Sequence, residues 1–342
     1  INTPELAEQA LEQKKADFIA MGRALIADPE LPNKAAAGRL SEIRPCIADN
    51  ECIDGLFVRG LRCTVNAAVG KEEKYQVRSA ALPKRVLVVG GGPGGMEVAR
   101  VAAQRGHTVT LCEKGNSLGG QLNIADKGPF KSEITEFTSY LVEQVHKLGV
   151  KVELNREVTA EFVAQLSPDV VIIAAGATPF IPPLPGVSGS NVVNAHDVLS
   201  GRKKTGVRII VIGGGRVGLE AAEFLAAQGK EVTILEMMNR VGDDLGVTVR
   251  APTLRRMRDL GVVMTAGAKA VEIKEGAVIF VQKGEKVTLP CDNVVLAVGA
   301  QADKTLEHSL AGRVQLYTIG DCVKPRNILE AIGEGAEIAL KL

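Results

Sequence analysis

A glycine-rich turn between two strand-like segments, at residues 86–113, limits the possible folds of this chain more than any other stretch. Four apolar residues lead into Gly90, Gly92 and Gly95, a helix-like segment follows, and a second strand ends on Glu113. In a βαβ dinucleotide site the first glycine makes the tight turn, the second lets backbone approach a diphosphate, and the third lets helix pack on strand. The helix N-terminus attracts the phosphates, and the acid accepts from ribose hydroxyls.

The same pattern recurs at residues 209–236. Its glycines are Gly213, Gly215 and Gly218, and its second strand ends on Glu236. The offset between the copies is constant from first glycine to terminal acid (213 − 90 = 123 and 236 − 113 = 123). A chance glycine-rich turn would not keep helix length and terminal acid in register. We therefore predict two dinucleotide sites rather than two structural turns, and call the spacing of 123 residues the repeat offset.

Three further kinds of segment extend these sites. A glycine pair after the first acid would let backbone pass close to a bound dinucleotide, and each predicted domain has a buried strand followed by a short segment containing glycine. A strand in the tail ends on an acid that can bond a polyol hydroxyl, although an ordinary turn aspartate fits equally well. The candidate residues of these segments are Gly120, Gln121, Ala175, Gly176, Gly299, Gly320 and Asp321.

Two other segments have structural patterns. Apolar residues at helical spacing from Ile134 to Leu148 predict a core-facing helix, with Gly149 placed to end it. Alternation between Ala270 and Leu289 predicts a small antiparallel meander.

Residues 1–45 predict a helix at Pro4–Lys15, a short strand at residues 17–21, and a second helix after Gly22 and Arg23. A strand, a glycine and a helix start can hold a phosphate in a parallel barrel, but the residues alone favour a plain βα unit. The chain begins with isoleucine, and its first helix has no preceding element to pack on. We therefore expect it to be the C-terminal part of a longer protein.

Half of the six cysteines lie close together, at Cys46, Cys52 and Cys63. Such spacing in a cytosolic chain points to metal or redox chemistry rather than to disulfides. Three thiolates are one short of the usual four, and Asp49 is the candidate fourth ligand because it lies three residues from both Cys46 and Cys52. The alternative is that the thiols are close by coincidence.

Composition argues against several partners. A net charge of +1 gives no basis for binding nucleic acid or membranes, and aromatic residues at 3% with no Trp argue against stacking on single-stranded nucleic acid. No apolar run reaches transmembrane length, and nothing resembles a signal peptide. We expect a cytoplasmic protein that acts on a small molecule, with a homo-oligomer as an open alternative to a monomer.

Together, GGGPGG with Glu113, the crossover at residues 177–179, GGGRVG with Glu236 and the closing TIGD resemble the two-dinucleotide-domain flavoprotein reductases. The resemblance covers residues 85–342. It implies an α/β fold of two Rossmann-like three-layer domains, as in glutathione reductase, with the NAD domain inserted in the FAD domain. The implied FAD-binding domain is 85–205 plus 300–342, and the implied NAD(P)H-binding domain is 206–299.

The N-terminal part narrows this resemblance. MGRALIADP, IRPC and the cysteines resemble the last strand of an old yellow enzyme barrel joined to an iron–sulfur segment. The whole chain thus resembles the C-terminal half of the 2,4-dienoyl-CoA reductase, 2-enoate reductase and trimethylamine dehydrogenase family. This implies that residues 1–45 are a remnant of an FMN-binding TIM barrel and that residues 46–84 are an iron–sulfur segment and linker.

The resemblance also implies roles for individual residues. Gly22 and Arg23 would contact the FMN phosphate, the three clustered cysteines would ligate a 4Fe–4S cluster, and Asp321 would contact the flavin. Asp49 departs from the family pattern, which has cysteine there, and a carboxylate is a harder ligand than a thiolate. We therefore expect a labile or altered cluster. Catalytic residues stay unknown, because the substrate pocket would lie in the missing barrel strands.

The implied function is electron input from NADH through FAD and the 4Fe–4S cluster to FMN, for reduction of an activated C=C bond of the 2-enoate or 2,4-dienoyl-CoA type. Glu236 favours NADH because its carboxylate would repel a 2′-phosphate, although Arg240 keeps NADPH open. The alternatives are an amine dehydrogenase or demethylase of the same family and a non-catalytic FAD-binding module. A thioredoxin-reductase-like enzyme is disfavoured because the cysteines outside the cluster segment form no C-x-x-C pair.

Overall fold

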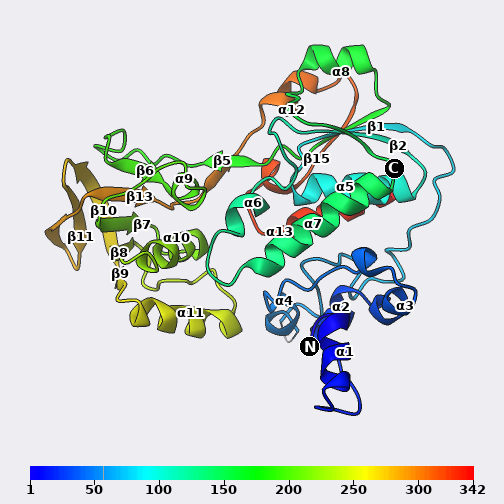
Figure 1. The fold of residues 1–342 in the computed structure, drawn as a ribbon. Helices are drawn as coiled ribbons and strands as arrows, with labels where there is room; N and C mark the ends of the chain where they lie inside the picture. Colours follow the sequence, from blue (N-terminus) through cyan, green and yellow to red (C-terminus); the bar gives the residue numbers. More distant parts are fainter. Residues whose placement is uncertain (57) are drawn as a thin grey trace. The chain divides into compact units, whose positions relative to one another are not determined.

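In the computed structural model, which describes residues 1–56 and 58–342, the chain divides into two compact units (Figure 1). The first unit comprises Ile1–Asn123, Ser132–Ala177 and Ala302–Leu342, and the second comprises Ile124–Lys131 and Thr178–Gln301. Both are built on a parallel sheet, as the sequence predicts.

The sheet of the first unit has the order β15-β4-β1-β2-β3, and all its strands are parallel. The tail supplies the edge strand β15, whose Gln315 pairs with Val170 of β4. The last segment of the chain therefore completes the sheet that the first glycine turn begins, which confirms the predicted insertion. The strands are β1 (Arg85–Val89), β2 (Thr108–Cys112), β3 (Lys151–Glu153), β4 (Val170–Ile173) and β15 (Gln315–Thr318).

Helices cover both faces of this sheet (Figure 1). Leu87 and Val89 of β1 pack toward Val163 of α8 and Leu310 of α12, while α5, α7 and α13 lie on the opposite face. Burial on both faces explains the continuous apolar runs of β1 and β4. The helices are α5 (Pro93–Gln104), α6 (Leu122–Ala125), α7 (Ser132–Lys147), α8 (Ala160–Leu166), α12 (Thr305–Leu310) and α13 (Ile328–Lys341), with a 3₁₀ turn η2 (Gly320–Cys322).

The sheet of the second unit has the corresponding order β6-β13-β7-β8-β9, again all parallel. Ile209 and Val211 of β7 pack in the core with α9, α10 and α11. Its strands are β6 (Val192–Asn194), β7 (Arg208–Ile212), β8 (Glu231–Glu236), β9 (Val263–Ala266) and β13 (Asn293–Leu296), and its helices are α9 (Ala195–Leu199), α10 (Arg216–Ala226) and α11 (Val247–Asp259).

A three-stranded antiparallel sheet covers the other face of the second parallel sheet and confirms the predicted meander. Ile210 and Ile212 of β7 pack against Val278 and Phe280 of this meander. Alternate residues of one strand thus enter two different cores, which gives the unit three layers. The meander strands are β10 (Ala268–Lys274), β11 (Ala277–Gln282) and β12 (Glu285–Pro290).

The repeat extends beyond the glycine turns to an Arg–Asp pair at the start of each first strand. Asp169 Oδ2 accepts from the backbone N–H of Arg85 at 2.7 Å, and Oδ1 accepts from its guanidinium at 3.0 Å. In the second unit Asp292 binds Arg208 in the same way, at 2.9 and 2.8 Å. Both residues of the second pair follow the first at the repeat offset, so whole domains are repeated.

Two short strands, β5 (Ala177–Pro179) and β14 (Ala300–Ala302), pair where the chain passes between the units. The structure groups residues 178–205 with the second unit, because β6 pairs there with β13. The boundary inferred from the sequence, at residue 206, lies later in the chain.

The N-terminal segment consists of short helices, and one prediction made for it is wrong. Residues 17–21, all within the described chain, form no strand, and Phe18 is 91% exposed. A strand needs a neighbour to satisfy its backbone hydrogen bonds, and no described strand pairs with this segment. The elements present are α1 (Pro4–Glu12), α2 (Arg23–Ala27), α3 (Leu31–Ala36), η1 (Leu40–Glu42) and α4 (Glu51–Asp54).

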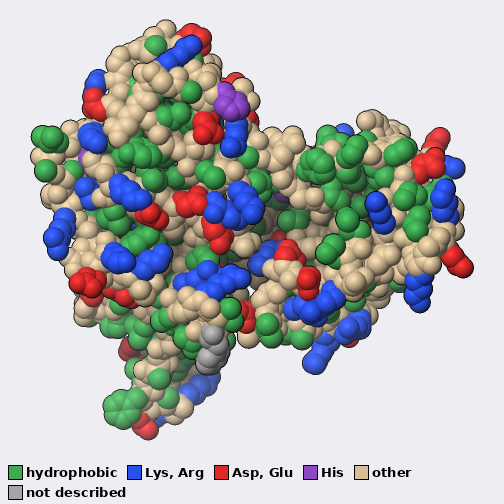
Figure 2. Space-filling view, turned by 180° about the vertical axis from the view of Figure 1, so that it is seen from behind, with side chains coloured by type: hydrophobic (Ala, Val, Ile, Leu, Met, Phe, Trp, Pro, Cys, Tyr) green, Lys and Arg blue, Asp and Glu red, His purple; other side chains and the backbone are tan. Residues whose placement is uncertain are grey.

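The surface carries mixed charge. Basic and acidic side chains are interspersed over the face shown in Figure 2, in keeping with a net charge of +1. Across the described residues, no helix combines the length and apolar character that a membrane span requires.

Candidate functional site

The first glycine turn joins β1 to α5 and requires glycine at two positions. Gly90 has φ +106, and a Cβ built there would lie 2.3 Å from the carbonyl oxygen of Ala174. A Cβ on Gly95 would lie 1.9 Å from the carbonyl oxygen of Gly90. A Cβ on Gly92, by contrast, would meet no heavy atom of the described residues within 4 Å, its chain neighbours aside. The open side of Gly92, at the N-terminus of α5, therefore fits a dinucleotide diphosphate.

The second turn joins β7 to α10 with the same backbone shape. Gly213 has φ +104, and a Cβ there would lie 2.3 Å from the carbonyl oxygen of Ala297. A Cβ on Gly218 would lie 1.9 Å from the carbonyl oxygen of Gly213. Gly215 is the N-cap residue of α10, as Gly92 is of α5.

The two terminal acids hold the glycine turns against the ends of β2 and β8. Glu113 accepts from the backbone N–H groups of Gly91 and Gly115, both at 2.7 Å. Glu236, which is 9% exposed, accepts from Gly214 at 2.6 Å and from Met238 at 2.7 Å. A carboxylate has about four acceptor positions, so each acid keeps capacity for ribose hydroxyls.

The glycine pair after β2 lies over the first turn. The N–H of Gly119 donates to the carbonyl oxygen of Gly91 at 2.8 Å. A Cβ on Gly120 would lie 3.0 Å from the Cα of Gly92. Predicted site residues from two separate segments therefore lie beside each other at Gly92.

Gln121 connects this segment to the tail of the chain. Its Nε2 donates to Oδ2 of Asp321 at 3.1 Å, and Asp321 Oδ1 accepts from the backbone N–H of Arg326 at 3.0 Å. Burial raises the pKa of Asp321, and these two hydrogen bonds offset the shift only in part. A carboxyl group with spare acceptor capacity thus lies just past the carboxyl end of β15, where the sequence predicts a flavin contact.

The glycines that follow β4 and β15 have left-handed backbone. Gly176, in the same loop as Ala175, has φ +81 and donates its N–H to Sγ of Cys322 at 2.9 Å. Gly320 has φ +65 and donates to Oε2 of Glu334 at 2.7 Å. Burial raises the pKa of Cys322 to about 11, which favours the protonated thiol over the reactive thiolate.

Gly299 occupies in the second unit the place that Gly176 has in the first, at the repeat offset. It has φ +100, and its carbonyl oxygen accepts from the backbone N–H of Phe180 at 3.0 Å. The second site thus lies at the carboxyl ends of β7, β8 and β13, the usual location for ligands in parallel sheets.

The predicted FMN contacts lie in the N-terminal segment. Gly22 is the N-cap of the five-residue helix α2, and the Arg23 guanidinium donates to Oδ1 of Asn50 at 2.5 Å. The contact of Gly22 and Arg23 with an FMN phosphate stays a prediction.

Asp49, the candidate fourth metal ligand, already serves as a hydrogen-bond acceptor. Its Oδ1 accepts from the backbone N–H of Glu51 at 3.3 Å, and its Oδ2 accepts from the hydroxyl of Thr64. Asp49 therefore ties the start of α4 to the segment that follows the last clustered cysteine.

The three clustered cysteines are not arranged as a metal site. Within residues 1–56 and 58–342, no three His, Cys, Asp or Glu side chains are placed to hold a metal ion. Burial raises the pKa of Cys63 to about 11, and burial together with the charges of Cys46 and Asp49 raises that of Cys52. Metal binding would itself deprotonate these thiols, so the raised pKa values do not exclude it, and the iron–sulfur cluster stays a prediction.

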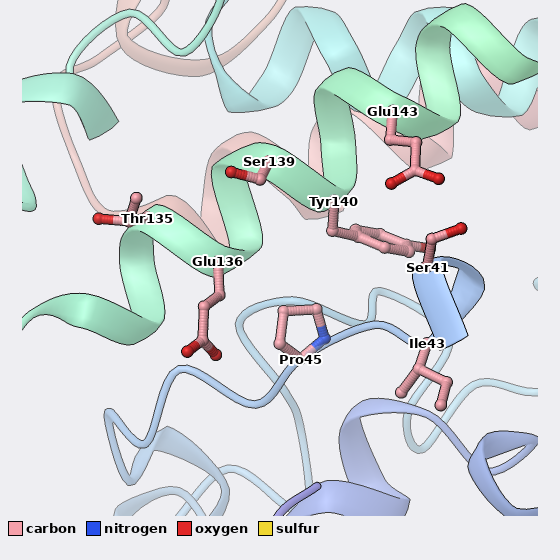
Figure 3. A pocket seen from close by; sticks show the side chains of 8 residues that line it. All are labelled: Ser41, Ile43, Pro45, Thr135, Glu136, Ser139, Tyr140 and Glu143. Carbon is pink, nitrogen blue, oxygen red and sulfur yellow. The ribbon is translucent and has the colours of Figure 1, made fainter. Parts of the chain in front are cut away.

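A shallow pocket of about 350 Å³ lies elsewhere in the first unit (Figure 3). It forms where the segment around η1 packs on α7, and the side chains of both segments face each other across it. None of its lining residues belongs to the predicted sites. They are Ser41, Ile43, Pro45, Thr135, Glu136, Ser139, Tyr140 and Glu143.

Comparison with known proteins places these features in a family. The model of the pyridine nucleotide-disulphide oxidoreductases matches residues 84–335. The NADH oxidase of Thermoanaerobacter brockii is 40% identical over 356 residues, which cover 100% of this chain and 54% of that protein. The cinnamate reductase of Clostridium sporogenes is 36% identical over 351 residues, with coverages of 98% and 51%.

A solved structure of 2-naphthoyl-CoA reductase in complex with 2-naphthoyl-CoA has the same fold, with a TM-score of 0.97 at 38% identity. The match covers 100% of this chain and 53% of that chain. The chain thus spans about half the length of the relatives it matches.

These likenesses confirm the resemblance to the C-terminal half of the enoate and CoA-ester reductases. They also support FAD and NAD(H) as the dinucleotides of the two folds. The chain belongs to the pyridine nucleotide-disulphide oxidoreductase family.

Proposed function

We propose that this chain is the electron-input part of an NADH-dependent flavoprotein reductase. The observation that carries the proposal is the repetition, at the repeat offset, of a glycine turn held by the carboxylate at the end of the next strand. Two such turns give one chain two dinucleotide sites, which suits transfer of reducing equivalents between two bound cofactors.

The first unit is the FAD site in this proposal. Gly92 and Gly120 leave room for the diphosphate, Glu113 accepts from the ribose, and Asp321 offers a half-buried carboxyl group to the flavin part. FAD, when bound, supplies a hydride acceptor that can pass on single electrons. The protein positions the group, and the redox chemistry belongs to the cofactor.

The second unit is the NADH site in this proposal, with Gly215 at the diphosphate and Glu236 at the ribose. A 2′-phosphate beside the Glu236 carboxylate would cost about 4 kcal/mol at roughly 4 Å in a partly solvated site. Arg240 is paired with Asp243 at 3.3 Å, so it is engaged within its own loop. Both observations favour NADH over NADPH.

The electron acceptor of the whole protein is proposed from the relatives. Cinnamate reductase and 2-naphthoyl-CoA reductase have names that denote reduction of conjugated acids or thioesters. We therefore propose an activated C=C bond as the substrate group, in a protein located in the cytoplasm. FMN and an iron–sulfur cluster are proposed for the longer protein only.

Diaphorase activity tests this function directly. The purified chain, loaded with FAD, is mixed with NADH and ferricyanide under anaerobic conditions, and NADH oxidation is followed. We expect steady turnover that needs FAD and saturates with NADH. Binding of FAD without NADH oxidation would instead support a non-catalytic FAD-binding module.

The substrate class is tested on the longer protein. We expect NADH-dependent reduction of 2-enoates or enoyl-CoA esters. Oxidation of methylated amines without consumption of NADH would assign the protein to the amine dehydrogenases instead.

A further inference from the structure

The loop after β8 brings a carboxylate to the N-terminus of α10. The N–H of Gly242 donates to the carbonyl oxygen of Gly214 at 2.7 Å, which places the loop over the second glycine turn. Two residues later, the Oδ1 and Oδ2 atoms of Asp244 accept from the backbone N–H of Arg216 at 3.1 and 2.9 Å. A Cβ on Gly215 would lie 3.2 Å from Asp244 Oδ2.

This is the position that a dinucleotide diphosphate would take. Arg216 is the first residue of an 11-residue helix that follows the glycine turn. Its N–H has no acceptor within the helix, and such N-terminal N–H groups attract phosphate. The Arg216 guanidinium also donates to the carbonyl oxygen of Asp244, at 3.4 Å. Asp244 therefore engages both the backbone and the side chain at this helix start.

The first unit lacks this feature at the corresponding positions. Its loop crosses the glycine turn in the same way, through Gly119 and Gly91 at 2.8 Å. At the repeat offset, however, Gln121 stands in place of Asp244 and is directed to Asp321, while Pro93 stands in place of Arg216 and has no N–H. The carboxylate is thus particular to the second turn rather than common to the repeated fold.

We propose that Asp244 is a built-in competitor for the diphosphate of the nicotinamide dinucleotide. Its carboxylate fills the anion position at the start of α10 and withdraws when the dinucleotide binds, which lowers the affinity for NADH and speeds release of NAD⁺. The inference rests on the proposed function, because it assumes that the second unit binds a nicotinamide dinucleotide.

The loop is suited to this movement. Asp243 and Asp244 are exposed, so withdrawal moves a carboxylate into water rather than into the core. Gly242, with φ +68, and Gly246, the N-cap of α11, flank the segment that would move. Two anions at one helix start repel each other, so the carboxylate and the diphosphate cannot both remain there.

Binding of NAD⁺ to the FAD-loaded chain tests the proposal by isothermal titration calorimetry. NAD⁺ is used because it does not reduce FAD. Asp244→Ala should lower the Kd for NAD⁺ on the order of fivefold, as expected for removing one charge from a helix N-terminus. Inorganic pyrophosphate should show the same direction of change. Asp259→Asn, which removes a charge from an exposed residue at the end of α11, is the matched control and should leave both affinities unchanged.

Asp244→Asn is a second variant, for the case that the alanine variant does not fold. It removes the charge but keeps an acceptor for the Arg216 N–H. Tighter binding by either Asp244 variant, with wild-type and Asp259→Asn affinities equal, supports the proposal. Unchanged or weaker binding by folded Asp244 variants overturns it and leaves the proposed function intact if the wild-type chain binds NAD⁺. Absence of NAD⁺ binding by every variant overturns both.

Discussion

Glu113 and Glu236 each hold a glycine turn in place and can also bind a ribose. Each accepts from one backbone N–H of a glycine turn and from one N–H of the segment after its own strand, and each keeps further acceptor capacity for a ribose in the proposed sites. A glutamine at either position would present an amide N–H₂ to a backbone donor, so one hydrogen bond to a charged acceptor would be lost.

Glu236→Gln should therefore raise the KM for NADH about tenfold or more, from the loss of one charge-assisted hydrogen bond. The measurement is diaphorase kinetics at saturating FAD. Glu113→Gln is the control, because it changes the same chemistry in the other unit: it should weaken retention of FAD and leave the KM for NADH unchanged. Equal effects of both variants on that KM would contradict the assignment of the two sites.

Asp292 gives a prediction for pH. Hydrogen bonds from the Arg208 backbone N–H, the Arg208 guanidinium and the Val207 N–H lower the pKa of Asp292 from 3.8 to about 2. The folded chain then binds fewer protons here than the unfolded chain, so the stabilisation is complete above 3.8 and is lost as pH falls toward 2. The difference in urea midpoint between wild type and Asp292→Asn should shrink over that window. A difference independent of pH would contradict the account.

For individual residues, the sequence predicts backbone roles better than side-chain contacts. The glycines and terminal acids could be identified because their spacing follows from the geometry of a βαβ unit. The contact between Gln121 and Asp321 joins residues 200 positions apart, and it depends on the tail returning to the first sheet. Asp244 was missed for a similar reason, although aligning the two repeats points to it.

Among the secondary-structure elements, α5 and α13 show how glycine allows close packing. A Cβ on Gly335 of α13 would lie 2.7 Å from the carbonyl oxygen of Gly94 in α5, whereas a Cβ on Gly333 would meet no described heavy atom within 4 Å beyond its own helix and chain neighbours. The two glycines thus differ in environment within one helix.

Gly335→Ala should lower the free energy of unfolding by about 1–3 kcal/mol, the usual effect of overpacking. Gly333→Ala should raise it by up to about 1 kcal/mol through helix propensity. Urea unfolding followed by circular dichroism measures both. Equal stability of the two variants would mean that α5 and α13 do not pack as described.

Helices and strands were predicted correctly where the spacing of apolar residues alone determines the secondary structure. Helix α7 and the meander β10–β12 follow from periodicity and from their turns. The strand expected at residues 17–21 failed because an apolar run becomes a strand only beside another strand. Strand β6 was not predicted. Its three residues form a strand because they pair with β13, and that pairing cannot be read from the three residues alone.

For the whole molecule, domain repetition was the most predictable feature. The Arg–Asp pairs, the glycine turns and the strands β1, β2 and β4 recur at the repeat offset, and the tail strand β15 completes the first sheet as the family resemblance implies. The passage between units at residue 178 was less predictable, because it depends on strand pairing rather than on composition.

In the proposed function, one chain binds FAD and NADH in its two repeated folds and reduces the flavin with the nicotinamide. Anaerobic stopped-flow mixing of the FAD-loaded chain with NADH tests it most directly, with flavin absorbance as the signal. We expect bleaching at a rate that saturates with NADH, with saturation at a higher NADH concentration in Glu236→Gln. Flavin absorbance that stays unchanged at millimolar NADH, in a chain shown to retain FAD, would contradict it.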